Sequence, residues 1–261
     1  MTEATATNPA KPETADLSIR TVWVVFSREF KSYFSTPLAA IFLAVFAALS
    51  AGLTFFAGGF FERGQADLSS FFTWQPWLLL ILMPALGMRL WAEERRSGTI
   101  EVLMTMPVRP WELVLGKFLA GWAFAGLAIV LTMPIWWTVN YLGSPDNGVI
   151  ASGYLGSWLM AGAFLAISSC ISAITRNQVI AFIGACIVGF LLAMAGTDLV
   201  LASVRGWAPP AITEAVQSLS FVSNFGRMTR GVIELPTVFY FLSLIVLCLW
   251  INVQNVVSKH S

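Results

Sequence analysis

Charged residues, histidine and cysteine are all scarce in this chain of 261 residues. Asp, Glu, Lys and Arg make up 11% of the residues and hydrophobic residues 57%. A soluble domain carries roughly twice as much charge, so the composition favours an integral membrane protein. The net charge is only +1, so the chain lacks the strong positive charge typical of nucleic-acid-binding proteins. Nucleic acid is therefore not expected as a partner.

The single histidine, His260, lies next to the end of the chain and leaves little room for histidine-based chemistry. Cys170, Cys186 and Cys248 lie inside apolar runs, and their spacing matches no zinc site or disulfide framework. We therefore predict neither a catalytic residue nor a metal site.

Long apolar runs predict six membrane-spanning helices, each close to the ~20 residues that cross a bilayer core or longer. They lie at residues 37–59, 73–91, 112–140, 151–174, 178–200 and 236–256. The third run exceeds what a bilayer core requires, so its start near Lys117 is expected at the membrane interface. Pro84 and Pro134 lie inside the second and third runs and predict kinks.

The remaining segments are less apolar. Residues 1–16 predict a disordered tail, and 257–261 a short C-terminal tail. Residues 212–225, in the long connection 201–235, predict one short interfacial or re-entrant helix. Residues 17–35 predict an amphipathic helix in the headgroup plane, with an apolar stripe formed by Ile19, Val22, Trp23, Phe26, Phe30 and Phe34.

The distribution of Lys and Arg predicts the orientation. If both termini, the 89–117 block and the 175–177 turn share one side, that side holds all basic residues except Arg63, Arg205, Arg227 and Arg230. The positive-inside rule then predicts that both termini are cytoplasmic.

A charged block separates the second and third spans. Glu93, Glu94, Arg95 and Arg96 are predicted to extend the second span into water, as a solvated face of ion pairs. A catalytic pair of Glu93 and Glu94 is less favoured, because adjacent helix residues point about 100° apart.

Ser97-Gly98 predicts a break after this face, and Thr99 is a candidate N-cap. Glu101 favours a helix N-terminus, and a short apolar helix then follows, containing Ile100, Leu103 and Met104. The segment is too short to fold alone and too apolar for water. It is expected either to dock into a partner's groove or to rest on lipid.

The run EERRSGTIEVLMTMPVRPWELVLGKFLAG resembles the cytoplasmic stretch of permease subunits of the type-2 ATP-binding-cassette (ABC) exporter family. The residues that match the pattern of that family are Glu94-Arg95, Gly98-Thr99, Glu101, Leu103, Pro107, Glu112, Gly116 and Lys117. SAITRNQVIAFI (172–183) resembles the family's turn between spans four and five. RGVIELPTVFYFLSL (230–244) resembles the approach to span six in the gliding-motility-associated branch.

The resemblance covers about residues 18–256. It implies an all-α integral membrane domain (17–256) with six transmembrane helices, the N-terminal amphipathic helix and a cytoplasmic coupling helix. The coupling region would hold a separate ABC ATPase subunit through Glu93, Glu94, Arg95, Arg96, Gly98, Thr99, Ile100, Glu101, Leu103 and Met104.

The chain has no G-x-x-x-x-G-K-[ST] phosphate loop, so ATP and Mg²⁺ are expected on the partner ATPase and no cofactor on this chain. The resemblance also implies a bacterial inner membrane location. A second permease subunit would be this chain itself or a related one with a large periplasmic domain.

Two functions stay open: ATP-driven export or force transmission, and a non-transporting scaffold that anchors a periplasmic or gliding-type machine. A membrane enzyme is a third and weaker hypothesis. The spans hold few charges, Asp198 being the main exception, which argues against an ion-driven transporter. A hydrophobic path for a lipid, glycan or peptide fits better, and no residue is assigned to a substrate.

Overall fold

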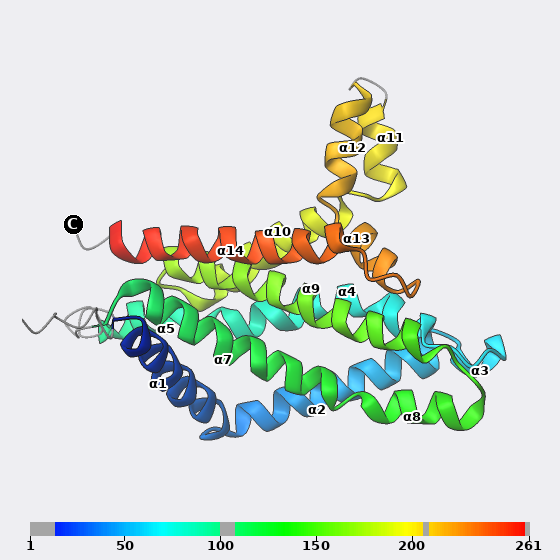
Figure 1. Ribbon diagram of the computed structural model, residues 1–261, viewed down its shortest axis with the longest axis horizontal. Coiled ribbons are helices and arrows are strands. Elements are labelled where there is room, and N and C mark those ends of the chain that lie inside the picture. Colours follow the sequence, from blue (N-terminus) through cyan, green and yellow to red (C-terminus); the bar gives the residue numbers. More distant parts are fainter. Residues whose placement is uncertain (1–13, 100–107, 206–208, 259–261) are drawn as a thin grey trace, which may run out of the picture.

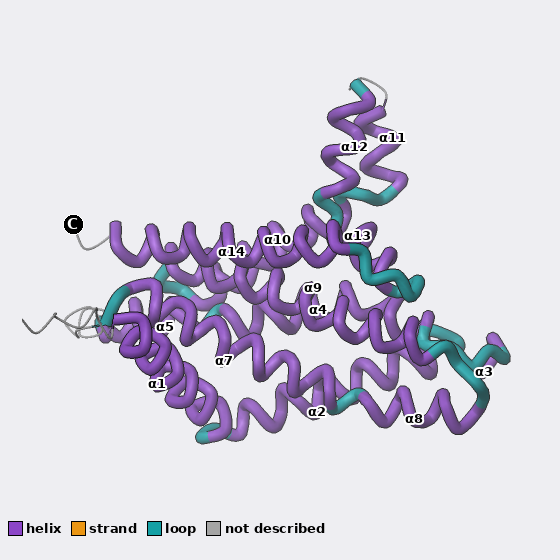
Figure 2. The backbone as a smooth tube through the Cα atoms, in the orientation of Figure 1, coloured by secondary structure: helices purple, strands orange, loops and turns teal. Residues whose placement is uncertain are grey.

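The computed structural model describes residues 14–99, 108–205 and 209–258, and the regular elements within these ranges are helices (Figure 2). The all-α membrane fold expected from the sequence is confirmed. A π-helical turn, η1 (Leu53–Ala57), follows α2. The α-helices are α1 (Thr14–Phe34), α2 (Pro37–Gly52), α3 (Phe60–Arg63), α4 (Ser69–Gly87), α5 (Arg89–Ser97), α7 (Pro110–Val130), α8 (Met133–Leu142), α9 (Asn147–Ile174), α10 (Gln178–Met194), α11 (Asp198–Arg205), α12 (Pro210–Ser218), α13 (Phe221–Met228) and α14 (Leu235–Ser258).

Five helical stretches in the described residues are long and apolar enough to cross a membrane, and α10 is a shorter apolar helix. The five are Pro37–Ala57, Ser69–Ser97, Pro110–Leu142, Asn147–Ile174 and Leu235–Ser258, and they correspond to five of the predicted spans. The predicted span 178–200 is corrected, because α10 ends at Met194 and α11 is a separate helix. The turn between them brings Gly196 against Ser220 and Ser223, so closely that a Cβ atom would clash.

Helix α9 is the centre of the bundle and contacts α4, α5, α7, α10, α13 and α14 (Figure 1). In its most apolar window 83% of the residues are buried, against 22% for α2 and for α14. Small residues permit this packing: a Cβ on Gly162 would lie 2.6 Å from Nε1 of Trp122. The Trp122 and Trp158 rings stack with centroids 4.2 Å apart, and each indole N–H donates to the other residue's carbonyl.

The second span is interrupted after Pro84 rather than at it. Helix α4 continues past Pro84 to Gly87, and α5 begins at Arg89. Side chains of α9 satisfy the backbone there: Ser168 Oγ donates to the carbonyl of Pro84 (3.3 Å) and Ser172 Oγ to that of Met88 (2.8 Å). Such partners satisfy the backbone groups that the break between α4 and α5 leaves free.

The third span is also two helices, because α7 ends at Val130 and α8 begins at Met133. The hydroxyl of Thr132 donates to the carbonyl of Ile129 (2.6 Å) between them. Pro134 lies in the first turn of α8, where a missing N–H costs little, so the interruption precedes the proline.

The predicted N-terminal helix is present as α1, which begins at Thr14 rather than at residue 17 and packs on α7. Of the predicted apolar stripe, Ile19, Trp23 and Phe34 are 71%, 65% and 50% exposed, as a face turned toward lipid would be, whereas Phe30 packs against the core. Within the predicted tail, residues 1–13 lie outside the described ranges.

The prediction of one helix over 212–225 is wrong. Helix α12 ends at Ser218, and α13 begins at Phe221 with Ser220 as its N-cap, whose Oγ accepts from the N–H of Ser223. Helices α11 and α12 contact each other and project from the side of the bundle (Figure 1).

We call the end of the bundle that holds α1, α5, the start of α7 and the last turns of α14 the α5 end (Figure 1). The opposite end, with α3, α8 and α13, is the α13 end. Contacts from α5 to Gln178 and to Asn255 place the 175–177 turn and the C-terminal turns at the α5 end as well. The described parts of the segments that the sequence assigned to one side therefore lie together.

Candidate functional site

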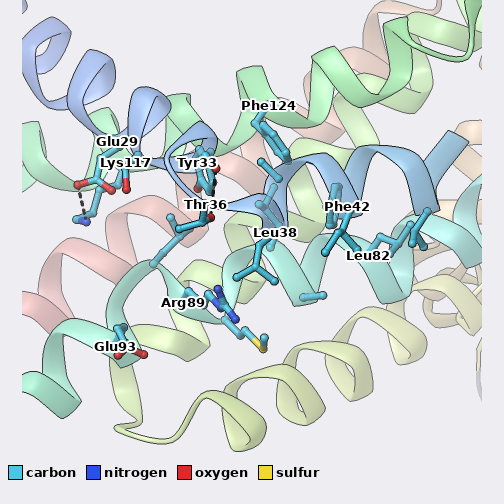
Figure 3. Close-up of a pocket in the computed structure, with 18 of the residues that line it drawn as sticks. Glu29, Tyr33, Thr36, Leu38, Phe42, Leu82, Arg89, Glu93, Lys117 and Phe124 are labelled. Carbon is cyan, nitrogen blue, oxygen red and sulfur yellow. Dashed lines mark hydrogen bonds and ion pairs between the residues drawn. The ribbon is translucent and has the colours of Figure 1, made fainter.

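A buried lysine joins three helices at the α5 end. Lys117 of α7 is 3% exposed, and its Nζ lies 2.7 Å from Glu94 Oε1 of α5 and 3.1 Å from Glu29 Oε1 of α1 (Figure 3). The ring centroid of Trp91 lies 5.5 Å from the same nitrogen. We call Lys117, Glu29, Glu94 and Trp91 the Lys117 cluster.

The start of α7 is built to receive α1. Pro110 is in its first turn, and Glu112 Oε2 accepts from the N–H of Arg109, which closes the first turn. The hydroxyl of Ser18 donates to the other oxygen of Glu112 at 2.6 Å. Gly116 lets the helices approach, because a Cβ there would lie 2.7 Å from Cγ1 of Val25.

The electrostatics of the cluster depend on its single buried cation. Burial pushes the pKa of Glu29 upward, but the positive charges of Lys117 and of Arg28, at 2.8 Å, outweigh it and hold that pKa below its ordinary value. Burial and the charge of Glu29 raise the pKa of Tyr33, which lines the same region. Removing one partner of such a buried pair leaves an uncompensated charge.

Helix α5 is also fixed to α9 and α14. The backbone N–H groups of Trp91 and Ala92 donate to Ser172 Oγ at 3.2 and 3.0 Å, and Trp91 Nε1 donates to Ser169 Oγ. Arg95 donates to the carbonyl of Asn255 at 3.3 Å. A displacement of α5 would therefore strain contacts with α1, α7, α9 and α14 together.

The four charged residues of α5 do not share one environment. Glu93 and Arg96 are exposed, as predicted, and Glu93 accepts a hydrogen bond from Gln178. The prediction that all four extend into water is wrong for Glu94, whose side chain is 18% exposed and turned onto Lys117. It is wrong in part for Arg95, which is half-buried against α14.

The predicted break after α5 is confirmed. Gly98 has φ of 74°, in the left-handed region that favours glycine, and ends the helix. Thr99 Oγ1 lies 2.9 Å from Ser97 Oγ. Ile100, Glu101, Leu103 and Met104 lie outside the described residues, so their docking role stays a prediction.

The sequence reading missed Glu29 and the partners of Lys117. A signal was present, because Ser18, Val22, Val25, Glu29 and Tyr33 are spaced three or four residues apart along one face of α1. Among the residues that the structure describes, no group of three His, Cys, Asp or Glu side chains could hold a metal ion.

Comparison with known proteins supports the resemblance seen in the sequence. A family model described as ABC-2 family transporter protein matches residues 68–253, more than half of the chain. The match includes α5, Lys117 and the segment between α5 and α7, but not α1. It names no gliding-motility branch, so that branch stays a prediction. No curated protein matches the chain.

Proposed function

Because the chain belongs to the ABC-2 transporter family, and is thus a membrane-spanning permease subunit of an ABC transporter, we propose that a separate ATPase subunit drives it through the segment after α5. Hydrolysis of ATP on that partner powers export or force transmission. ATP and Mg²⁺ bind to the ATPase and not to this chain.

The Lys117 cluster is the observation that carries this proposal. The segment 98–109 joins the end of α5 to the start of α7, so a force applied there acts on both helices. The ion pairs of Lys117 tie these two helices to each other and to α1, and the contacts of Ser172 and Arg95 pass the force to α9 and α14. Movement of this one docking segment would therefore shift several spans together, between two arrangements of the bundle.

The candidate residues divide into two roles. An apolar docking face is supplied by Ile100, Leu103 and Met104. Glu101 stabilises the N-terminus of the short helix that carries this face. Exposed Glu93 and Arg96 supply polar contacts that orient the ATPase. Gly98 and Thr99 form the joint. Glu94 and Arg95 transmit motion inside the permease.

The complete assembly contains two permease subunits above two ATPases. The second permease is this chain itself or a related chain that carries a large periplasmic domain. The assembly lies in the bacterial inner membrane, with the α5 end and both termini in the cytoplasm. The excess of Lys and Arg at the α5 end supports this orientation.

Co-purification with a co-expressed candidate ABC ATPase subunit tests the docking claim. We expect Leu103→Asp to abolish capture of the ATPase, because a carboxylate cannot enter an apolar groove without loss of solvation. Val232→Asp, at an exposed position of the α13 end, is the matched control and should capture the ATPase as wild type does. If no ATPase binds the wild type, the scaffold function replaces this proposal.

ATP hydrolysis by the captured complex tests the transmission claim. Glu94→Gln should leave capture intact but reduce hydrolysis about tenfold or more, since the link from α5 to Lys117 is weakened. Glu93→Gln, the adjacent exposed carboxylate, should change capture modestly and hydrolysis per captured complex little. Equal hydrolysis by Glu94→Gln and wild type would contradict the transmission role.

A further inference from the structure

A pocket of about 530 Å³ lies beside the Lys117 cluster, between the start of α2, the last turns of α4, α5 and α7 (Figure 3). Its walls are apolar over most of their length and include Leu38, Phe42, Leu82 and Phe124. Charged side chains gather at one end: Glu29 of α1, Arg89, Glu93, Glu94 and Lys117. The pocket is therefore amphipathic, with an apolar channel that leads to a charged end.

The pocket opens sideways, in the direction that a membrane would occupy. Leu38, Ile41 and Val45 of α2 line it and are also 46%, 57% and 41% exposed. They belong to a helix that is long and apolar enough to span a bilayer. The charged end lies where α4 gives way to α5, at the limit of the second span's apolar part, which is the depth of lipid headgroups.

Two opposite charges at this end lack a partner. Arg89 is exposed and makes no hydrogen bond or ion pair with the described residues. Glu94 uses Oε1 for Lys117, while its buried Oε2 has no hydrogen-bond partner. Buried carboxylate oxygens are almost always paired, so this oxygen calls for a donor. Among the described residues, the pocket thus offers the guanidinium of Arg89 and Oε2 of Glu94 to a ligand of mixed charge.

We propose that this pocket binds a zwitterionic phospholipid whose headgroup carries a phosphate and a primary ammonium. The phosphate lies against Arg89, the ammonium donates to Glu94 Oε2, and an acyl chain fills the channel between Phe42, Leu82 and Phe124. An anionic headgroup without a cation would face the carboxylates of Glu29, Glu93 and Glu94 and would leave Glu94 Oε2 without a donor. A quaternary ammonium has no N–H to donate to Glu94. Binding requires no ATPase, so this proposal stands apart from the coupling role.

Native mass spectrometry of the purified full-length chain, stripped of lipid in detergent, measures the binding. Dioleoyl phosphatidylethanolamine should bind at least tenfold more tightly than dioleoyl phosphatidylcholine or dioleoyl phosphatidylglycerol. Glycerophosphoethanolamine, which has the headgroup without acyl chains, should not compete at equal concentration. Equal affinity for the three lipids would overturn the headgroup assignment, and effective competition by the chain-free compound would overturn the lipid assignment.

Two variants, each with a control, test whether the lipid binds in this pocket. Arg89→Gln should weaken phosphatidylethanolamine binding at least tenfold, whereas Arg176→Gln, an exposed arginine outside the pocket, should not. Ala85→Trp should fill the channel and block binding, whereas Ala48→Trp, on an exposed part of α2 outside the pocket, should not. Monodisperse elution and an unchanged lipid-free melting temperature confirm folding. Wild-type binding by both Arg89→Gln and Ala85→Trp would overturn the proposal.

The preference for a primary ammonium has its own variant. Glu94→Gln removes the negative acceptor, so its affinity for phosphatidylethanolamine should fall to that for phosphatidylcholine. Retention of the full preference in this variant would overturn the role given to Glu94. The assay uses this chain alone, so a failure here differs from a failure to capture the ATPase.

Discussion

The two ends of the bundle bury polar groups of different kinds. At the α5 end, Lys117, Glu29 and Glu94 form buried ion pairs between helices distant in the sequence. At the α13 end, the buried polar groups are neutral: Ser152 Oγ donates to the carbonyl of Met228 (2.8 Å), and Asn224 Nδ2 to those of Ser218 and Ser220. The ion pair there, Arg227 with Glu234 at 3.5 Å, is 45% and 39% exposed.

This difference indicates different tasks. A neutral hydrogen bond to a backbone carbonyl satisfies the ends of short helices and changes little with pH or salt. A buried ion pair contributes little net stability, but separating one partner from the other leaves an uncompensated buried charge and is costly. The pair therefore couples the positions of the helices that carry it. The α13 end is thus held statically, and the α5 end is suited to transmit displacement.

Removing the cation should have the largest effect. Lys117→Met leaves Glu94 buried without its ion-pair partner and Glu29 with Arg28 alone, and we expect a loss of about 3–5 kcal/mol in the free energy of unfolding. Denaturant unfolding in detergent, followed by tryptophan fluorescence, measures it. Lys31→Met, at an exposed position of α1, is the control and should change stability by less than about 0.5 kcal/mol. A loss no greater than that of the control would mean that the cluster is solvated in solution.

Each end has a helical glycine, and substitution of the two glycines by alanine should change stability in opposite directions. Gly116→Ala should destabilise by about 1–3 kcal/mol, because its Cβ would lie 2.7 Å from Val25 Cγ1 and 3.2 Å from the carbonyl of Val22. Gly226→Ala in α13 has open space and should stabilise by about 0.5–1 kcal/mol. Melting temperatures of both variants check the signs. A neutral Gly116→Ala would show that α1 does not pack tightly on α7.

The pH dependence of the free energy of unfolding should also distinguish the α5 end, which holds the buried carboxylate of Glu29, from the α13 end, whose buried polar groups are neutral. The folded-state pKa of Glu29 is lowered, so its contribution to stability is fully present above its ordinary pKa of about 4.3 and lost as pH falls through the folded value. Groups facing Glu29 are Arg28, Lys117, Glu94 and Tyr33. Wild type should exceed Glu29→Gln in stability at pH 6–7, with the difference shrinking below about pH 4. A difference that is constant over this range would exclude Glu29 as the titrating group.

The smallest effect is expected from the exposed ion pair of the α13 end. Arg227→Gln should change the free energy of unfolding by no more than about 0–1 kcal/mol, because solvent screens the pair. Unfolding in low and high salt measures it, and the small difference should disappear in high salt. A salt-independent loss of several kcal/mol would contradict the static, screened character given to this end.

Local features were predictable from the sequence because local physics decides them. The apolar runs predicted the long helices, and Ser97-Gly98 predicted the end of α5, since glycine alone adopts a φ of 74° at little cost. The end of α10 at Met194 was missed, because apolar residues resume at Leu199 and Val200 after Thr197 and Asp198, and the turn depends on packing against α13. The partners of Lys117 were missed for the same reason, since they come from α1 and α5.

By itself, the sequence determined that this chain is an all-α membrane protein of the ABC-2 family, with a charged block between its second and third long apolar runs. Only the tertiary structure decided which helix is central and which charges are internal. Helix α9 has a mean hydropathy of 1.7 and is mostly buried, whereas α2 has 2.3 and is mostly exposed. Hydropathy reports how favourably a side chain leaves water. An apolar side chain leaves water equally well when it enters lipid and when it enters the protein interior. Close packing of small residues and pairing of buried charges make the choice between them.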